Sequence, residues 1–581
     1  MKLKILFFVL LCATVNLNAQ GDKAKWAKFL GGDLEVGGPE LEFTEAAQFN
    51  NVVRDGDFII VNGWYDFVAC WNGEILPYSE GKNGIVSKLD LDGNVIWTTI
   101  TTGSGFPAGF YEIAVDNNGD IIAVGHHFSE DEFFINGEQV SEASIELFVR
   151  AYVAKFSGED GSLIWYQEGK ADGTLAISRL TIDEENNIYG LGYYGSGWEC
   201  EEFTIGGTTV PLLEGSNYNI FYFKMNTEDG TCDWVKTWGN PDPDTHCILN
   251  PRSIDIKNGN IYMGFSVLGT ILINEERYTG DQLGILKIDA ENGAISKHIF
   301  FGGDEGAQNL AHLRIDQDGN VAASGFFTSS SNFRIGEFTL QGNTQAILMR
   351  AFEDGFVAKF DANLNPIWAN SIGGAYTDRA FNLEITPNGY ISIAGGFDPD
   401  APIMYNGKAI TSRVSTGLSM FQLFVDKDGT FKDIFTLFVG DGYSVFTNSM
   451  TVTHPSGRTY TAGNWAGDAN ILDPTGIMES SDHEKGFIME WDRQLTTSIK
   501  DINVGNASVS VYPNPFVDEL TVNVNEESTV DVEINDLTGR LVYSSNFNNN
   551  QTINLSSLNK GIYILTVKGQ NVESTTKIIK K

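Results

Sequence analysis

The feature that most constrains this chain is a short motif that returns seven times. It reads VRDGD at Gly56, VDNNGD at Gly119, IDEENN at Asn186, IKNGN at Gly259, IDQDGN at Gly319, TPNGY at Gly389 and HPSGR at Gly457, at spacings of 60 to 73 residues. Apolar residues alternate on both sides of the motif, which is the period of a half-buried strand. Its Asp and Asn side chains can bond nearby amides, and its Gly accepts a positive φ. Each copy therefore predicts a β-hairpin.

A second hairpin follows in the same phase of most copies, as in SKLDLDGNVIW, AKFSGEDGSLIW and AKFDANLNPIW. Trp97, Trp165, Trp234 and Trp368 stand at equivalent places in it. Four short antiparallel strands per copy are typical of one propeller blade. A repeat array also explains how 581 residues avoid a single oversized core. We therefore predict an all-β fold, with a seven-bladed β-propeller of four-stranded blades over residues 20–495.

These repeats resemble the bacterial SBBP family of β-propeller repeats, over about residues 26 to 495. The shared marks are a GG segment, a D-x-x-G-N turn, an F-V-A-K-x-D segment and a Trp, and the fifth copy carries all of them. The resemblance implies a propeller fold and extracellular use, and it implies no reaction. The segment K-F-x-x-x-D-G-x-x-x-W is also similar to quinoprotein propellers, in which such tryptophans dock between blades. The sequence lacks the neighbouring cysteine pair of quinone-binding dehydrogenases, so we interpret the tryptophans as packing residues.

The segment WAKFLGG at residues 26–32 matches WANSIGG at residues 368–374, which is a fourth strand. No first three strands precede it, and the seventh copy loses its pattern after Trp491. We predict that residues 26–32 complete the last blade by pairing with the strand through Ile488 and Trp491, which would remove an open sheet edge. The segment 496–504 could supply the same strand, although residues 496–506 have the character of a linker.

Residues 1–19 have the form of an export signal, with two lysines, an apolar run and a cleavage site between Ala19 and Gln20. A lipoprotein signal would use Cys12, but Leu11 before it is a poor match. No other apolar run approaches the length of a membrane helix. We therefore expect a protein without an integral membrane segment that is exported through the periplasm and is secreted or held at the outer cell surface.

Residues 507–581 consist of short alternating strands without the repeat marks. They resemble the type A C-terminal sorting domain of the Gram-negative type IX secretion system. The residues that carry the resemblance are Tyr512, Pro513, Asn514, Pro515, Gly539, Gly561, Tyr563, Lys577, Lys580 and Lys581. The resemblance implies a small Ig-like β-sandwich, recognition by the type IX secretion machinery, and removal of the domain after translocation. The alternative is an ordinary terminal sandwich of adhesive type.

The formal charge of −38 lies almost entirely within the repeat array and disfavours nucleic acid and anionic lipid as partners. Four cysteines remain after the expected cleavage, and their spacing matches neither a zinc module nor a redox pair. In a propeller, Cys200 after a second strand and Cys247 in a crossing between copies share one face, whereas Cys232 lies on the other. We therefore predict a Cys200–Cys247 disulfide.

No nucleophile elbow, phosphate loop or zinc-protease motif is present in the sequence, and we expect no cofactor and no metal. Each copy, however, places an aromatic or histidine ring directly after its second strand. Packing between blades is one explanation of these rings. The other is a stacking platform for a glycan or protein ligand, rimmed by Glu201 and Glu202. For that platform we predict exposed positions for Trp64, Tyr65, Trp71, Tyr193, Tyr194, Trp198 and Trp465.

These observations favour a secreted or surface binding protein without enzymatic activity. Two other functions stay open: a polysaccharide-active enzyme with its acid and base on the loops, and a structural surface protein whose partner is another copy.

Overall fold

The structure is a computed structural model that describes the following residues: 24–31, 46–78, 81–103, 109–128, 130, 132–143, 149–171, 173–195, 202–211, 219–239, 248–274, 276–303, 306–328, 332–342, 352–398, 401–411, 419–438, 450–469, 479–491, 509–512, 516–524, 529–536, 540–548, 550–568 and 573–581. These residues form strands, turns and connections, and they contain no helix. No described segment is therefore a helix that could cross a membrane.

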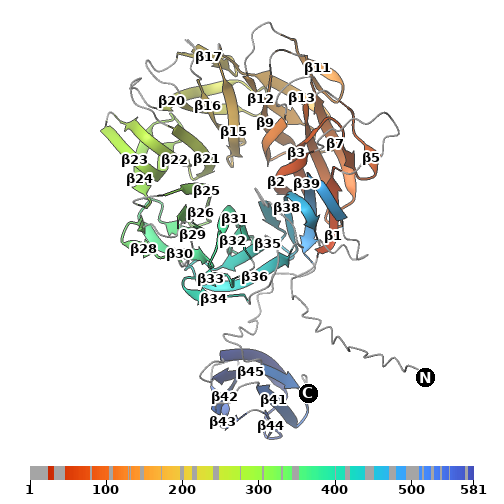
Figure 1. Ribbon diagram of the computed structural model, residues 1–581, viewed down its shortest axis with the longest axis vertical. Helices are drawn as coiled ribbons and strands as arrows, with labels where there is room; N and C mark the ends of the chain where they lie inside the picture. The colour runs from red at the N-terminus through yellow and green to blue at the C-terminus, as the bar shows by residue number, and fades with distance from the viewer. Residues whose placement is uncertain are drawn as a thin grey trace, which may run out of the picture.

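Antiparallel sheets follow one another along the chain and surround a common axis, as expected for an all-β, propeller-like arrangement (Figure 1). The first sheet contains β2 (Ala47–Asp55), β3 (Phe58–Asp66), β6 (Lys82–Asp90) and β7 (Val95–Thr102). The second contains β8 (Gly109–Val115), β9 (Ile121–Phe128), β12 (Val149–Phe156) and β13 (Leu163–Glu168). The third contains β15 (Leu175–Ile182), β16 (Asn187–Tyr194), β19 (Asn219–Asn226) and β20 (Cys232–Gly239).

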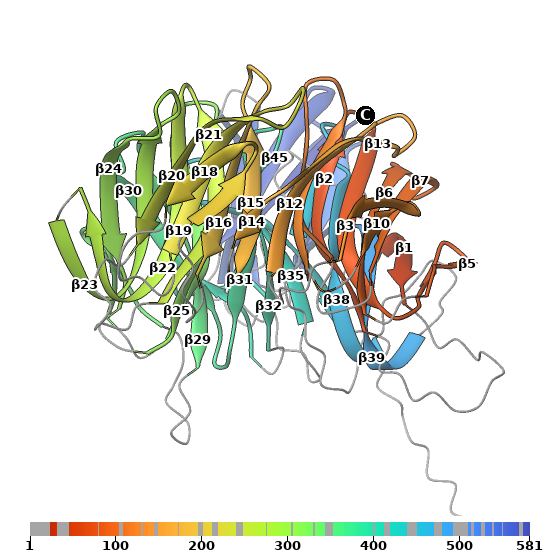
Figure 2. The ribbon, with the colours of Figure 1, turned by 90° about the horizontal axis from the view of Figure 1, so that it is seen from above.

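The next sheets repeat this order. They are β21 (Ile248–Lys257), β22 (Asn260–Ile273), β23 (Glu276–Asp289) and β24 (Ile295–Phe301); β25 (Gln308–Ile315), β26 (Val321–Thr328), β29 (Glu353–Phe360) and β30 (Pro366–Gly373); β31 (Arg379–Ile385), β32 (Ile391–Phe397), β35 (Ser419–Val425) and β36 (Phe431–Phe438); and β37 (Met450–Thr453), β38 (Thr459–Ala469), β39 (Glu479–Trp491) and β1 (Ala24–Leu30). Figure 2 shows the sheets from the side, with their strands standing roughly parallel to the axis.

The first strand of each sheet lies nearest the axis. These first strands are β2, β8, β15, β21, β25, β31 and β37, and each contacts the first strand of the next sheet, with β37 contacting β2. The predicted turn after each first strand is confirmed: Gly319 has φ +82°, and the corresponding residue of every other copy is also left-handed. Asp316 Oδ1 accepts the amides of Asp318 (2.9 Å) and Asn320 (2.8 Å), which explains the Asp at the start of the motif.

β1 pairs antiparallel with β39, with Lys28 opposite Ile488 and Leu30 opposite Gly486. This is the partner that the WAKFLGG match predicted, although the strand runs from Ala24 to Leu30 rather than to residue 32. Leu30 is fully buried, in one hydrophobic cluster with side chains of β2, β3 and β38. The N-terminal strand therefore joins the last sheet of the repeat array to the first.

The tryptophans of the fourth strands do dock against the next sheet. Trp97 Nε1 (3.3 Å) and Lys88 Nζ (2.8 Å) donate to the Gly158 carbonyl of the following sheet. The same arrangement joins Trp165 and Lys155 to the Thr227 carbonyl, and Trp368 and Lys359 to the Lys427 carbonyl. Figure 1 shows the neighbouring sheets that these bonds connect.

Trp26 of β1 takes this docking role where the last sheet meets the first. Its Nε1 donates to the Leu91 carbonyl (3.2 Å), which also accepts from Arg458 Nη2 (2.6 Å). The residue opposite Trp26 is Glu490, where the other sheets have lysine, and Arg458 Nε donates to Glu490 Oε1 (2.6 Å). The Trp26 ring lies against Gly93, where a Cβ would come within 2.9 Å of it. β1 therefore docks on the next sheet through its tryptophan, and an arginine supplies the second donor.

The long connections between second and third strands contain short hairpins that the repeat analysis did not anticipate. These are β4 (Cys70–Trp71) with β5 (Glu74–Ile75), β10 (Phe133–Ile135) with β11 (Glu138–Ser141), β17 (Glu202–Ile205) with β18 (Thr208–Pro211), β27 (Phe333–Ile335) with β28 (Phe338–Leu340), and β33 (Met404–Tyr405) with β34 (Lys408–Ala409). We call them the latch hairpins. Most pair with the end of the preceding sheet: β4 with β1, β10 with β7, β33 with β30, and β17 with β14 (Lys170–Ala171).

The C-terminal region forms two further sheets, β40 (Val509–Tyr512), β41 (Glu519–Val524) and β44 (Asn550–Asn554), and β43 (Leu541–Asn548), β42 (Thr529–Asp536), β45 (Gly561–Lys568) and β46 (Glu573–Lys580). Alternate residues of both sheets, including Val522, Ile553, Val532 and Leu565, meet in one hydrophobic cluster. The region thus has its own core.

Candidate functional site

A row of polar side chains follows a β-bulge in the first strands. The bulge occurs at the corresponding place in six of them, and the residue after it is Asn51, Glu112, Arg179, Ser253, His312 or Asn382. A bulge re-aims the side chains that follow it, so these six residues share one orientation relative to the axis.

All of these side chains except Glu112, which accepts from the preceding first strand, form a hydrogen bond with the next first strand. Asn51 Nδ2 donates to Glu112 Oε1 (2.7 Å), and Arg179 Nε donates to the Arg252 carbonyl (2.6 Å). In the following sheets Ser253 Oγ accepts the Leu313 amide (3.1 Å), His312 Nδ1 donates to the Leu383 carbonyl (2.9 Å), and Asn382 Oδ1 accepts the Thr451 amide (3.4 Å). The partners are 60 to 73 residues apart in sequence.

Charged residues gather in the same place. We call Glu112, Arg179, Arg252, Asp255, Arg314 and Glu384 the axial cluster; they come from β8, β15, β21, β25 and β31. Arg179 Nη1 lies 3.8 Å from Glu112 Oε2, too far for a hydrogen bond. Asp255 accepts the amides of Ile256 (2.9 Å) and Ile315 (2.8 Å). The Arg314 charge acts on Glu112, Asp255 and Glu384, so the cluster is one electrostatic unit.

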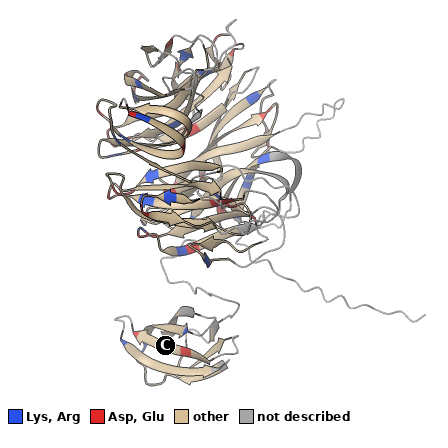
Figure 3. Ribbon diagram, turned by 60° about the vertical axis from the view of Figure 1, so that its left-hand side comes forward, with Lys and Arg blue, Asp and Glu red and all other residues tan. Residues whose placement is uncertain are grey.

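Burial governs the titration of the cluster. It raises the pKa of Glu112 and of Asp255 despite the nearby arginines, and it raises the pKa of Glu384 to about 7. It lowers the pKa of Arg252 to about 10, with a further contribution from the like charge of Arg179. Burial thus disfavours the charged form of each of these groups, acids and arginine alike. Acidic and basic side chains are otherwise spread over the strands (Figure 3).

The predicted aromatic platform is wrong for three of its members. Tyr65 and Tyr194 are 0% exposed and Trp71 is 2% exposed. The reason is the latch hairpins, because Trp71 belongs to one of them and packs edge-on against Phe49 at 5.3 Å. Tyr194 likewise contacts Phe203 of the next latch hairpin, at 5.0 Å between ring centroids. The sequence held a signal for these hairpins in the Asn-Gly pairs at 72–73, 136–137 and 406–407, which favour two-residue turns.

Trp64 and Tyr193 remain partly exposed, and they lie within the second strands β3 and β16 rather than after them. Lys82 Nζ lies 3.5 Å from the centroid of the Trp64 ring and covers one of its faces. Trp198 and Glu201 lie outside the described residues, as does the side chain of Trp465, and Glu202 is exposed at the start of β17. The structure thus leaves two of the predicted rings accessible within the part of the chain that it describes.

The adjacent histidines of the second sheet belong to a buried polar network. His127 Nε2 is 3.0 Å from Glu168 Oε1, and Ser141 Oγ donates to the same oxygen (2.5 Å). Burial opposes ionisation of Glu168, but these hydrogen bonds and the nearby charges lower its pKa to about 2. His126 stacks on Tyr111 at 4.5 Å, and its burial lowers its pKa to about 4. Among the described residues, no group of three acidic, histidine or cysteine side chains is arranged to hold a metal.

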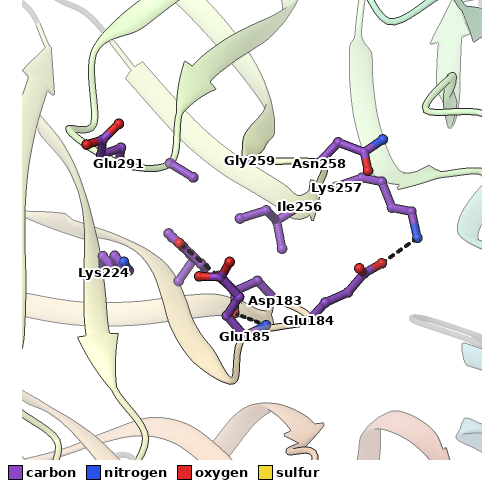
Figure 4. Close-up of a pocket in the computed structure, with 11 residues that line it drawn as sticks. Asp183, Glu184, Glu185, Lys224, Ile256, Lys257, Asn258, Gly259 and Glu291 are labelled. Atoms are coloured by element: carbon purple, nitrogen blue, oxygen red, sulfur yellow. Dashed lines mark hydrogen bonds and ion pairs between the residues drawn. The ribbon is translucent and has the colours of Figure 1, made fainter.

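A surface pocket of about 410 Å³ lies between the sheets of β15 and β21, at their first turns. Figure 4 shows Asp183, Glu184, Glu185 and Glu291 around it, with Lys224 and Lys257. Two of these carboxylates already have partners: Asp183 Oδ2 accepts from the Tyr189 hydroxyl (3.0 Å), and Glu184 pairs with Lys257 (2.9 Å). The pocket is an acidic groove between neighbouring turns.

Several further predictions concern residues without a described position. Ala19, Gln20, Cys200, Cys247, Pro513, Asn514, Pro515 and Gly539 lie outside the described residues, as do the side chains of Tyr512 and Lys577. Of the other cysteines, Cys70 and Cys232 are not in disulfides. The signal cleavage and the Cys200–Cys247 disulfide stay predictions.

The last strand of the C-terminal region is fixed by residues of the predicted sorting signal. Lys580 is buried, and its Nζ donates to the Val517 carbonyl and to Asp518 Oδ1 (3.2 Å). The Lys581 amide donates to the Phe516 carbonyl (2.9 Å). At the start of β45, which begins at Gly561, the Tyr563 hydroxyl donates to the Asn559 carbonyl (2.8 Å). The chain end is thus part of the fold.

Comparison with protein families identifies this region. Residues 510–581 match the secretion system C-terminal sorting domain. The predicted sorting domain is confirmed, and it indicates export to the cell surface or the medium through the type IX machinery. The match covers the C-terminal region and leaves the family of the preceding sheets open.

Two curated proteins are similar to parts of the chain. Ulvan lyase NLR42 of Nonlabens ulvanivorans is 36% identical over 93 residues, which are 16% of this chain and 17% of that protein. An uncharacterized WD repeat-containing protein, L264 of Acanthamoeba polyphaga mimivirus, is 24% identical over 480 residues, or 77% of this chain and 30% of that protein. The chain therefore spans less than a third of either relative.

Among solved structures, the quinohemoprotein alcohol dehydrogenase of Comamonas testosteroni is similar in fold, with 11% sequence identity and a TM-score of 0.34. The match covers 86% of this chain and 80% of the dehydrogenase chain. A likeness of this size does not bear on function.

Proposed function

We propose that this protein is a binding protein, secreted or displayed on the cell surface, in which a seven-bladed β-propeller presents a ligand site and the C-terminal sorting domain directs export. The observation that carries the proposal is the match of residues 510–581 to the sorting domain, because it places the chain among exported cargo. The ligand class that we favour is an extracellular glycan or protein.

The seven-bladed ring is supported by two sets of contacts. The first strands contact one another in sequence from β2 to β37, and β37 contacts β2. Between the last and first sheets, Trp26 docks on the Leu91 carbonyl in the manner of the other fourth-strand tryptophans. In such a ring β1 covers the edge of β39 that would otherwise be free, and the remaining edges are short, which suits a protein that works outside the cell.

The export proposal is tested in the bacterium that encodes the protein. The full chain and a variant without residues 510–581 are expressed with an epitope tag after residue 20, and cells and medium are assayed separately. The full chain should reach the medium or become accessible to added protease on intact cells, whereas the truncated chain should stay inside. Export of the truncated chain at the same level would refute the proposal.

The partly exposed rings Trp64 and Tyr193, together with Trp198 and Trp465, stay our candidates for ligand contact. An exposed aromatic contact contributes about 1 to 3 kcal/mol to binding when it is a central anchor. A glycan array probed with the purified chain and with a Trp64→Ala variant tests this. Loss of glycan signals in the variant at an unchanged melting temperature would support the assignment, and an array without any bound glycan would count against it.

A second candidate function is that of a polysaccharide-active enzyme, which the similarity to ulvan lyase NLR42 favours. A lyase cleaves by elimination, whereas an enzyme of the hydrolase type would need two carboxyl groups about 5 to 9 Å apart. The groove of Asp183, Glu185 and Glu291 is the acidic surface that should be examined first. Release of oligosaccharides from ulvan by the purified chain, and its loss in a Glu185→Gln variant, would support this function over simple binding.

A further inference from the structure

The axial cluster contains a cation that the described protein does not neutralise. Arg252 Nε is shielded from solvent and has no hydrogen-bond partner among the described residues. No ion pair of Arg252 is found among those residues, and the neighbouring charge that acts on it is another cation, Arg179, whose Nε donates to the Arg252 carbonyl. A buried donor that carries charge and has no partner is costly, so it normally has a counterion or an ordered ligand.

The carboxylates nearby do not supply that counterion. Glu112 is 3.8 Å from Arg179, and its Oε2 has no hydrogen-bond partner among the described residues. Its other oxygen accepts from Asn51, and both oxygens of Asp255 are occupied by backbone amides. Glu112 therefore pairs only loosely with Arg179, and neither acid forms an ion pair with Arg252 among the described residues.

We propose that Arg179 and Arg252 bind the carboxylate of a small ligand. The guanidinium group presents a planar fork of donors that fits a carboxylate in a bidentate manner. Arg179 keeps 23% of its side chain exposed, so the pair is accessible to solutes. Arg252 is the extra residue of the bulge between Pro251 and Ser253, so it has no partner residue on β22.

The net charge of the protein limits the class of ligand further. The chain carries −38 overall, and such a field repels polyanions. A singly charged carboxylate meets less repulsion from that field, and from Glu112 and Asp255, than a sulfate or phosphate dianion. The ligand class is therefore a small monocarboxylate, either a simple organic acid or an acidic sugar residue.

This inference deepens the proposed binding function and rests on it for its biological meaning. Its test uses the purified mature chain and is independent of export. Failure of export with carboxylate binding intact would therefore refute the proposed function alone.

The experiment is isothermal titration calorimetry with sodium glucuronate, sodium acetate and glucose at constant ionic strength. We expect saturable binding of glucuronate and none of glucose. Binding of acetate would identify a general carboxylate site, whereas its absence would identify recognition of the sugar as well. A wild-type chain that binds neither carboxylate would overturn the proposal.

Variants locate the site. Arg252→Gln should weaken glucuronate binding at least tenfold. Arg252→Lys keeps the charge but loses the fork, so it should give an intermediate affinity and serves as the test if the glutamine variant does not fold. Arg334→Gln, on the exposed face of β27, is the matched control and should bind as the wild type. Wild-type affinity in both Arg252 variants would refute the assignment.

Discussion

The N-terminal strand offers the sharpest test of how this fold is held together. Leu30 is fully buried, and it packs in the cluster that joins the last sheet to the first. We predict that Leu30→Ala destabilises the protein by about 2 to 5 kcal/mol, because a large-to-small change in a core loses transfer free energy and leaves a cavity. Trp26→Phe should cost less, about 1 kcal/mol, because the Leu91 carbonyl keeps Arg458 as a donor.

The matched control is Ile96→Ala. Ile96 lies on β7, the fourth strand of its own sheet, and is 49% exposed. Truncation of an exposed side chain away from special features usually changes stability by less than about 0.5 kcal/mol. The comparison therefore separates the loss of a buried contact from a general effect of shortening an aliphatic side chain on a fourth strand.

The assay is urea unfolding followed by tryptophan fluorescence. All eleven tryptophans lie between residues 26 and 491, so the signal reports the sheet array and not the sorting domain. At an unchanged slope, the midpoint should fall in proportion to the lost free energy. If the midpoint for Leu30→Ala equals those of the wild type and Ile96→Ala, the buried Leu30 contact of β1 contributes nothing to stability. The hypothesis that this strand holds the ring closed would then be wrong.

Three further predictions concern export, titration and packing. The exported protein should begin at Gln20 and lack roughly its last 75 residues, as the sorting-domain resemblance implies, and an intact mass that retains residues 510–581 would contradict this. Glu384 has its pKa raised to about 7 by burial, so its contribution to stability is complete below the ordinary glutamate pKa and is lost as pH rises through 7. Glu384 faces Arg54, Arg314 and Thr453. The urea midpoint of the wild type should therefore fall more between pH 5 and pH 8 than that of Glu384→Gln. Equal changes of the midpoint in the two proteins would refute this role of Glu384. Trp71→Ala should cost about 3 to 5 kcal/mol as a buried residue, whereas Trp198→Ala should leave the melting temperature nearly unchanged; a stable Trp71→Ala would contradict the latch packing.

The sequence determined those features that depend on neighbours in the chain. The turn at Gly319 could be predicted because Asp316, Asn320 and the glycine act on one another within five residues. The sorting domain was recognisable for a similar reason, since its motifs are contiguous. The pairing of β1 with β39 is a long-range contact, yet it was predicted because residues 26–32 repeat a fourth strand that occurs elsewhere in the same chain.

Only the tertiary structure decided which side chains are exposed and which charges meet. Tyr65 and Tyr194 lie at the ends of the same strands as Trp64 and Tyr193, but alternate residues of a strand face opposite sides, and the latch hairpins cover one of these sides. The axial cluster joins residues of five successive sheets, and the hydrogen bonds around it connect residues 61 to 74 positions apart. Each of its members is an ordinary polar residue in its own repeat. Their proximity, and the burial that shifts their pKa values, arise only when the first strands gather around one axis.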